Sequence, residues 1–218
     1  MTTVLVWSER NEPNAPGFRD CTYASGLMGL LWAGFTAFPK GLYSVEEREA
    51  LERSDDQPDE TGSSIDDLRV AIKRRYGVER ATRPVGTLSA DLDHELVGMA
   101  LQGKLSNLPA GHRLRKWQPS FTGGHCVFLY RSLTGIYHWF DPLAPNKSDG
   151  DTCTKAEVLQ YAIGFGAHMV FNRDELAPVK TYTQAEYDAG IKAATAPLAE
   201  QLAKANLVIA KVRAALGQ

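Results

Sequence analysis

The stretch that decides the fold is His125–Asp141, HCVFLYRSLTGIYHWFD. It holds two runs rich in aromatic and aliphatic residues, 125–130 and 136–141, separated by the five residues RSLTG. Such runs favour β-strands, and a short connection that ends in glycine favours a hairpin. The sequence therefore predicts an antiparallel hairpin here, and a further strand over 167–171 (AHMVF).

The region before the hairpin is predicted to be mostly helical. Leucines recur at helical spacing after Asp20, which is a favourable N-cap residue. A hydroxyl residue followed three positions later by Glu or Asp also marks a helix start, because each side chain bonds the other's end amide. This pattern begins at Ser44, Ser64, Thr154 and Thr183. Residues 91–103 are predicted to form a further helix and 4–7 a short strand. Helices followed by an antiparallel sheet indicate an α+β fold.

The residues after 180 have a different pattern. Ile191, Leu198, Ala205 and Val212 are spaced by seven, and a second series of the same spacing runs beside them. Pro197 interrupts this heptad-like seam, because it lacks an amide hydrogen and clashes with the preceding turn. Such a helix packs either on its own domain or against a second copy. We therefore expect a domain of residues 1–180 and a C-terminal helical tail, 181–218, with residues 183–218 as a possible contact in a homo-oligomer.

Composition excludes several classes of function. The 218 residues include 24 basic and 26 acidic side chains, so the chain lacks the strongly basic character of most nucleic-acid-binding domains. Its three cysteines are too few and too scattered for a disulfide framework. The sequence shows no secretory signal and no membrane span, which predicts synthesis in the cytoplasm.

Cys21 is the first candidate for chemistry. A thiol in the first turn of a helix lies near unsatisfied backbone amides and the positive end of the helix dipole, and both favour the thiolate. The neighbouring Asp20 opposes this effect, so a reactive thiolate would need an imidazolium partner. The alternative is a small buried cysteine of the core, which is the usual fate of a lone cysteine.

His125 and Asp141 are the second candidate pair. A hairpin that closes symmetrically about Leu133 pairs residues whose numbers sum to 266, which places these two directly opposite each other, with Cβ atoms about 4.5–5.5 Å apart. A carboxylate at that distance can orient an imidazole and stabilise its charged form. The alternative is a purely structural cross-strand pair. Cys126 points to the other face of the strand and is predicted to belong to the core.

No cofactor or metal is predicted. His125, Cys126, His138 and Cys153 have neither a zinc-binding motif nor paired-cysteine spacing.

Three dipeptides occur in an order that is typical of a known family. Asp20-Cys21 begins a predicted helix, Gly124-His125 begins a predicted strand, and Asp141-Pro142 follows at the end of the hairpin. In this order they resemble a papain-like cysteine peptidase of the bacteriocin-processing (double-glycine leader) type. Residues 95–104, the helix at Thr154 and the strand at Ala167 resemble further elements of that domain, so the resemblance covers roughly residues 3–172.

The resemblance implies a role for each of these residues. Cys21 would be the nucleophile, His125 the general base and acid, and Asp141 the residue that orients the histidine. Such peptidases usually carry a glutamine before the cysteine that donates to the oxyanion, and here the nearest amide side chains are those of Asn14 and Asn11.

The sequence therefore predicts a cysteine peptidase or amide hydrolase that acts on a peptide or a peptidoglycan-type substrate, with Cys21 more reactive than Cys126 and Cys153. One alternative is a papain-like structural subunit with little or no activity, associated with a phage virion and assembled through the helical tail. Another is an acyl transferase with the same three residues, because the sequence does not separate transfer from hydrolysis.

Overall fold

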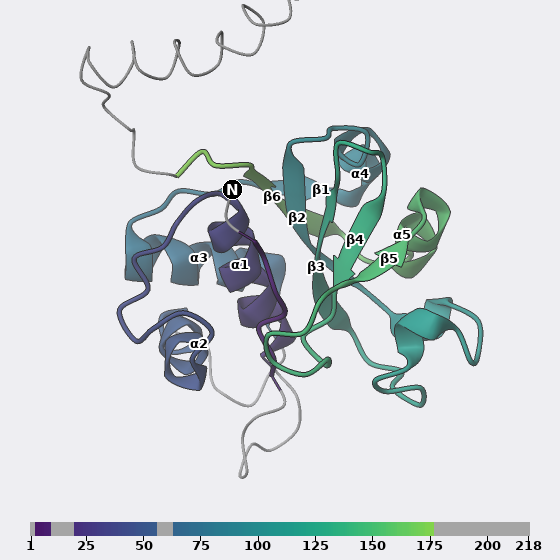
Figure 1. The fold of residues 1–218 in the computed structure, drawn as a ribbon, viewed down its shortest axis with the longest axis horizontal. Coiled ribbons are helices and arrows are strands. Elements are labelled where there is room, and N and C mark those ends of the chain that lie inside the picture. The colour runs from purple at the N-terminus through teal and green to yellow at the C-terminus, as the bar shows by residue number, and fades with distance from the viewer. Residues whose placement is uncertain (1–2, 10–19, 56–62, 177–218) are drawn as a thin grey trace, which may run out of the picture. The chain divides into compact units, whose positions relative to one another are not determined.

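The computed structural model describes residues 3–9, 20–55 and 63–176 (Figure 1). The chain divides into two units, Met1–Ala177 and Pro178–Gln218. The second unit lies outside the described residues, as do the heptad-like seam and the predicted helix start at Thr183. No helix in the described part of the chain is long and apolar enough to cross a membrane.

A six-stranded antiparallel sheet forms the centre of the first unit. Its strand order is β1-β6-β2-β3-β4-β5. The strands are β1 (Thr82–Pro84), β2 (Val97–Gly103), β3 (His125–Arg131), β4 (Tyr137–Phe140), β5 (Asp151–Cys153) and β6 (Ala167–Asn172). The predicted hairpin is β3–β4 and the predicted strand at 167–171 is β6, so these predictions are confirmed.

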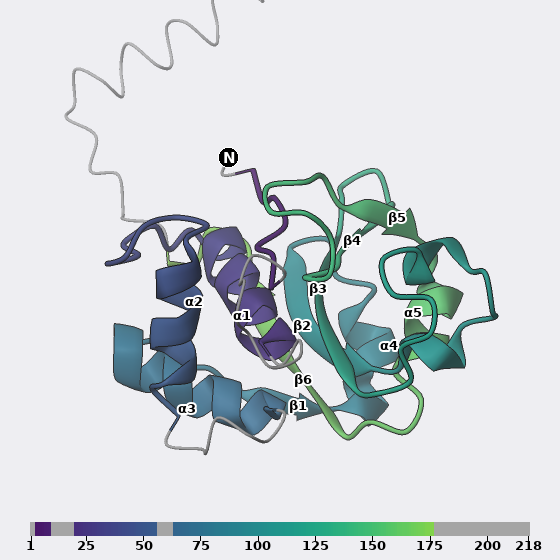
Figure 2. The same cartoon turned by 90° about the horizontal axis from the view of Figure 1, so that it is seen from below.

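Helices cover both faces of this sheet. They are α1 (Cys21–Trp32), α2 (Val45–Glu52), α3 (Ile65–Tyr76), α4 (Leu88–Asp91) and α5 (Lys155–Tyr161), with short 3-10 turns at Val85–Thr87, Leu105–Asn107 and Arg113–Arg115. Figures 1 and 2 show α1, α2 and α3 on one face, and α4 and α5 on the other. The mixture of helices and antiparallel sheet confirms the predicted α+β class.

Alternation along β3 builds the two apolar layers of the core. Cys126 and Phe128 belong to the cluster that contains α1, whereas Val127 and Leu129 belong to the cluster with α4 and α5. All four side chains are fully buried. Cys126 is thus a core residue, as predicted, and it faces the helix that begins at Cys21.

The capping patterns mark real helix starts. Ser64 and Thr154 each form the reciprocal box in full, at α3 and α5. At α2, Ser44 accepts from the amide of Glu47, but the Glu47 carboxylate accepts from the amide of Lys40 and not from that of Ser44. Only half of the predicted box forms there.

Two predicted elements are wrong. Residues 91–103 do not form one helix: α4 ends at Asp91, and Val97–Gly103 is the strand β2, which lies between β6 and β3. Because β2 is covered on both faces, its apolar residues run almost continuously, and such a run does not distinguish a strand from a buried helix. Residues 4–7 form no regular strand, although Val6 exchanges backbone hydrogen bonds with Lys147 and Ser148.

Close packing sets α1 against the sheet. A Cβ at Gly29 would overlap the ring of Phe171 on β6, and one at Gly26 would overlap the side chain of Leu68 on α3. Glycine at these positions lets the helix backbone approach its neighbours closely, which fixes the position of its first residue, Cys21.

Candidate active site

Cys21 is the first residue of α1 and its side chain is nearly buried, with 9% exposed. Asp20 occupies the N-cap position but its carboxylate makes no capping hydrogen bond. The Nε of Arg48, on α2, donates to the Asp20 carboxylate instead, at 2.8 Å. Asp20 is thus the N-cap residue, as predicted, but its carboxylate bonds a buried guanidinium and not the end amides of the helix.

A backbone contact ties the Cys21 sulfur to the start of β3. The Cys126 N–H donates to Sγ of Cys21 across 3.3 Å. Cys126 directly follows His125, so this bond brings the thiol from the end of a helix to the histidine at the end of a strand. The two residues are separated by more than one hundred positions in the sequence.

The His125 ring bonds Asp141 in a buried environment. The distance between Nε2 and Oδ1 of Asp141 is 2.7 Å, and each side chain is 2% exposed. The same carboxylate oxygen accepts from the amide of Leu143 at 2.8 Å. Because Nε2 is engaged by the carboxylate, Nδ1 is the ring nitrogen that remains for a proton exchanged with Cys21.

Two aromatic side chains surround the histidine. The Tyr161 hydroxyl, on α5, donates to the His125 carbonyl at 2.6 Å, which holds the backbone of this residue. Phe121 lies edge-to-face with the imidazole, with ring centroids 6.1 Å apart. These contacts restrict the ring to the orientation in which it reaches Asp141.

The hairpin register differs from the predicted one. Phe128 pairs with Phe140 and Leu129 with Trp139, so paired numbers sum to 268 and not to 266. His125 and Asp141 are therefore diagonal neighbours rather than directly opposed. A change of two in the sum keeps both side chains on one face, whereas a change of one would have separated them. The predicted contact forms although the predicted register is wrong.

Electrostatics favour a charged His125. Burial alone would lower the pKa of this imidazole, but the charges and hydrogen bonds of Asp141 and Cys21 outweigh burial and raise the pKa well above its ordinary value. Burial has the opposite consequence for the two other thiols, since it raises the pKa of Cys126 strongly and that of Cys153 to about 12. Both stay protonated near neutral pH.

The other sequence candidates have different outcomes. Asn11 and Asn14, the predicted oxyanion donors, lie outside the described residues. His138 stacks on Tyr130 with centroids 4.8 Å apart. His168 bonds the Asp91 carboxylate at 2.8 Å.

Two glycines directly precede His125, and both lie against aromatic rings. A Cβ on Gly123 would come within 2.9 Å of the Phe121 ring, and one on Gly124 within 3.2 Å of Phe165. These rings occupy the space that a side chain at either position would need.

Sequence reasoning missed Arg48 and Tyr161. Tyr161 ends a helix whose start was predicted, but nothing in the sequence indicates that its hydroxyl reaches His125. Arg48 lies in a charged segment, VEEREALE, that is typical of an exposed helix. Its burial depends on the position of Asp20, which only the tertiary structure sets.

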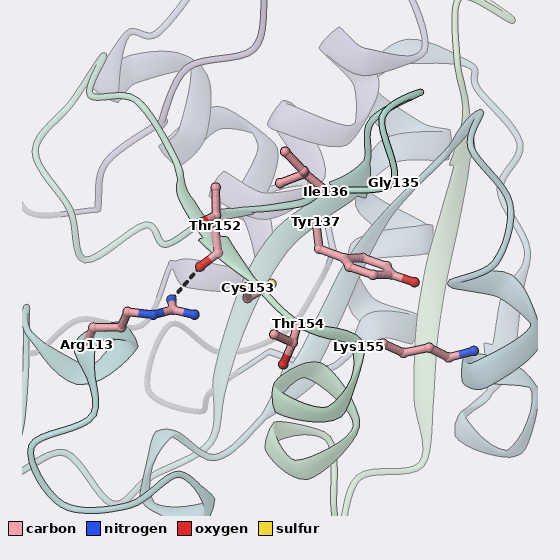
Figure 3. A pocket seen from close by; sticks show the side chains of 8 residues that line it. All are labelled: Arg113, Gly135, Ile136, Tyr137, Thr152, Cys153, Thr154 and Lys155. Atoms are coloured by element: carbon pink, nitrogen blue, oxygen red, sulfur yellow. Dashed lines mark hydrogen bonds between the residues drawn. The ribbon is translucent and has the colours of Figure 1, made fainter.

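A hollow of about 520 Å³ lies at the β5 edge of the sheet, away from these residues (Figure 3). It is lined by the hairpin end, β5 and the start of α5. Arg113 bonds the Thr152 carbonyl across it, and Lys155 bonds the carboxylate of Asp93. Its two cations are thus paired within the protein, and none of Cys21, His125 and Asp141 lines it.

Comparisons with known proteins give a likeness among solved structures. No family model matches the chain, and no curated protein matches it. Among solved structures, it is similar to a candidate C39-like peptidase from Bacillus anthracis, with 14% identity and a TM-score of 0.48, over 78% of this chain and 98% of that one. This likeness carries no argument about function, and the roles of Cys21, His125 and Asp141 are inferred from the contacts described above.

Proposed function

We propose that this protein is a papain-like cysteine peptidase or a related amide hydrolase. Cys21 is the nucleophile, His125 the general base and acid, and Asp141 the residue that orients the imidazole. The observation that supports this proposal is a buried imidazole bonded to a carboxylate at 2.7 Å, beside a thiol at the start of a helix. Its raised pKa, to which Cys21 contributes, is what a thiolate–imidazolium pair requires.

The reaction begins when the Cys21 sulfur attacks the amide carbonyl carbon and a C–S bond forms. The negative charge moves to the carbonyl oxygen, where the N–H of Cys21 at the first turn of α1 is one proposed donor. His125 transfers its proton to the amide nitrogen, the C–N bond breaks, and the amine leaves a thioester on Cys21. His125 then takes a proton from water as the hydroxide attacks the thioester. The C–S bond breaks, the carboxylic acid product leaves, and the Cys21 thiolate beside the protonated His125 is regenerated.

Asp141 keeps the imidazole oriented through both proton transfers. It accepts from Nε2 while Nδ1 exchanges the proton, so the ring does not need to rotate between the two steps. The Leu143 amide, bonded to the same carboxylate oxygen, holds the carboxylate in place.

The proposed substrate is a peptide or a peptidoglycan-type amide, both of which suit a thiol nucleophile. Asn14 or Asn11 is the proposed second oxyanion donor. A single donor of this kind contributes about 3–4 kcal/mol to transition-state stabilisation, so the substitution of the relevant asparagine by alanine would slow turnover markedly.

The test is a digestion screen with peptides and muropeptides, analysed by mass spectrometry. The wild-type protein should cleave at least one substrate, and Cys21→Ala should lose at least about 10³-fold of that rate. Cys153→Ala is the matched control, because this thiol lies on β5 outside the site, and it should retain cleavage. No cleavage by the wild type, or equal cleavage by Cys21→Ala, would refute the proposal.

A further inference from the structure

A buried arginine lies behind the nucleophile. The Arg48 side chain, in the middle of α2, is 0% exposed. Its Nε donates to the Asp20 carboxylate at 2.8 Å, and its Nη1 donates to the carbonyl of Ser8. A buried guanidinium is expensive to desolvate and is retained only with close acceptors. Arg48 thus connects α2 to the residue just before Cys21 and to the chain near the N-terminus.

The contacts of Ser8 extend this connection to the other side of the site. The Ser8 amide donates to the side chain of Asn146 at 3.2 Å, and its hydroxyl donates to the carbonyl of Pro142 at 3.4 Å. Pro142 directly follows Asp141. The hydrogen bonds thus run from Asp20 through Arg48 and Ser8 to Pro142. Because Asp20 and Pro142 are the chain neighbours of Cys21 and Asp141, these bonds join the helical half of the site to the sheet.

Charge is the second consequence of this arrangement. The Asp20 carboxylate is adjacent in sequence to Cys21, and its side chain is only 14% exposed. An uncompensated carboxylate there would repel a thiolate, as the sequence alone suggests. The Arg48 guanidinium supplies the opposite charge at hydrogen-bond distance and stays protonated.

Other charged groups also face this cluster. Burial lowers the pKa of Arg48, and the carboxylates of Glu9, Glu49 and Glu52 act in the opposite direction. The imidazole of His125 and the buried thiol of Cys126 also interact with Cys21. Asp20 is the carboxylate adjacent to Cys21 in the chain, and the Nε of Arg48 bonds it at 2.8 Å.

We infer that Arg48 is a positioning residue that neutralises Asp20 beside the nucleophile and holds the two sides of the site together. This inference rests on the proposed role of Cys21 as a thiolate nucleophile. It assigns a function to the ion pair between Arg48 and Asp20, because the Asp20 carboxylate alone would disfavour the thiolate of Cys21.

The test compares single and double variants of Arg48 and Asp20 by the alkylation rate of Cys21. The rate of Cys21 modification by iodoacetamide is measured against pH and assigned by peptide mapping, with Cys126 and Cys153 as buried internal references. Arg48→Met removes the cation that bonds the Asp20 carboxylate, so the midpoint of the profile should rise by about one pH unit. Asp20→Asn leaves the guanidinium, so the midpoint should fall. The double variant restores the balance and should return close to the wild-type midpoint.

A purely structural role predicts another result. Both single variants would then lower the melting temperature, but their midpoints would stay unchanged or move in the same direction, and either outcome overturns the inference. Arg48→Lys keeps the charge and should hold the wild-type midpoint even if stability falls. If Arg48→Met does not fold, a downward shift in Asp20→Asn that the double variant reverses still supports the inference, and its absence overturns it.

Failure of this inference is distinguishable from failure of the proposed function. Alkylation needs no substrate, so the cycle gives a result even if the digestion screen finds no cleavage. Opposite midpoint shifts without cleavage would support the role of Arg48 and refute the peptidase proposal. Cleavage of a substrate with unchanged alkylation midpoints would support the peptidase proposal and refute the role of Arg48.

Discussion

At the scale of single residues, the site depends on a carboxylate that overcomes the cost of burying a charged ring. Burial disfavours the imidazolium of His125, and Asp141 together with Cys21 reverses that preference. The pKa in the folded protein is thus above the ordinary value of 6.5. The stability contributed by this proton is fully present below pH 6.5 and is lost as the pH rises through the folded pKa.

The substitution Asp141→Asn tests this balance. The carboxamide still offers an oxygen to the Leu143 amide but carries no charge, so burial should dominate and the pKa of His125 should fall below its wild-type value. Turnover should drop about 10²–10⁴-fold, as expected for the loss of an orienting carboxylate. Titration of the histidine ring protons by NMR measures the change.

His138 serves as the internal reference for that titration. Its pKa is lowered by burial alone, and it lies outside the bonded pair, so its resonance should titrate alike in both proteins. An unchanged pKa of His125 in Asp141→Asn would show that the carboxylate does not stabilise the imidazolium.

At the scale of elements, the sequence was most informative where local chemistry decides the structure. The capping boxes at Ser64 and Thr154 involve residues three positions apart, and both form as predicted. The sequence pattern of Val97–Gly103 predicts a helix, but the segment is a strand because it pairs with β3 and β6, which lie far away in the sequence. The hairpin was predicted, but its register was not, since no rule for a five-residue connection fixes the pairing to within one position.

The packing of α1 gives a prediction at this scale. Gly29→Ala places a methyl group in the Phe171 ring, so the helix or the ring must move, and the variant should be less stable by about 1–3 kcal/mol. Urea unfolding followed by circular dichroism measures the loss. Gly86→Ala is the matched control, because no atom lies within 4 Å of the added carbon, and it should change stability little. Equal stability of the two variants would contradict the close approach of α1 to β6.

At the scale of the whole molecule, the three residues of the site come from three separate segments. The helix start singles out Cys21 and hairpin parity singles out His125 and Asp141, and the structure brings the predicted His125–Asp141 contact together. The sequence singles out neither Arg48 nor Tyr161, because their contacts exist only once α2 and α5 have packed. Sequence patterns predict single helices and strands and the face that each buries. Arg48 and Tyr161 instead form hydrogen bonds between separate elements.

The C-terminal tail gives the prediction for the complete chain. We propose that residues 183–218 mediate self-association through their heptad-like seam. Multi-angle light scattering should then give a mass above 23.9 kDa for the full chain and a monomer mass for residues 1–180. A monomer mass for both proteins would contradict this role and remove the main support for the alternative of an assembly subunit.

The hydrogen bonds of Ser8 also have a consequence for biosynthesis. Ser8 and Asn146 are separated by 138 positions, so a nascent chain exposes the first of them long before the second leaves the ribosome. Helix α1 can form early, but the hydrogen bonds of Ser8 to Pro142 and Asn146 cannot form until residues 141–146 have emerged. A polypeptide that ends before residue 141 would therefore contain Cys21 without Asp141 and without the Ser8 hydrogen bonds. The contacts of Ser8 that connect the two sides of the site would form only once residue 146 has been made.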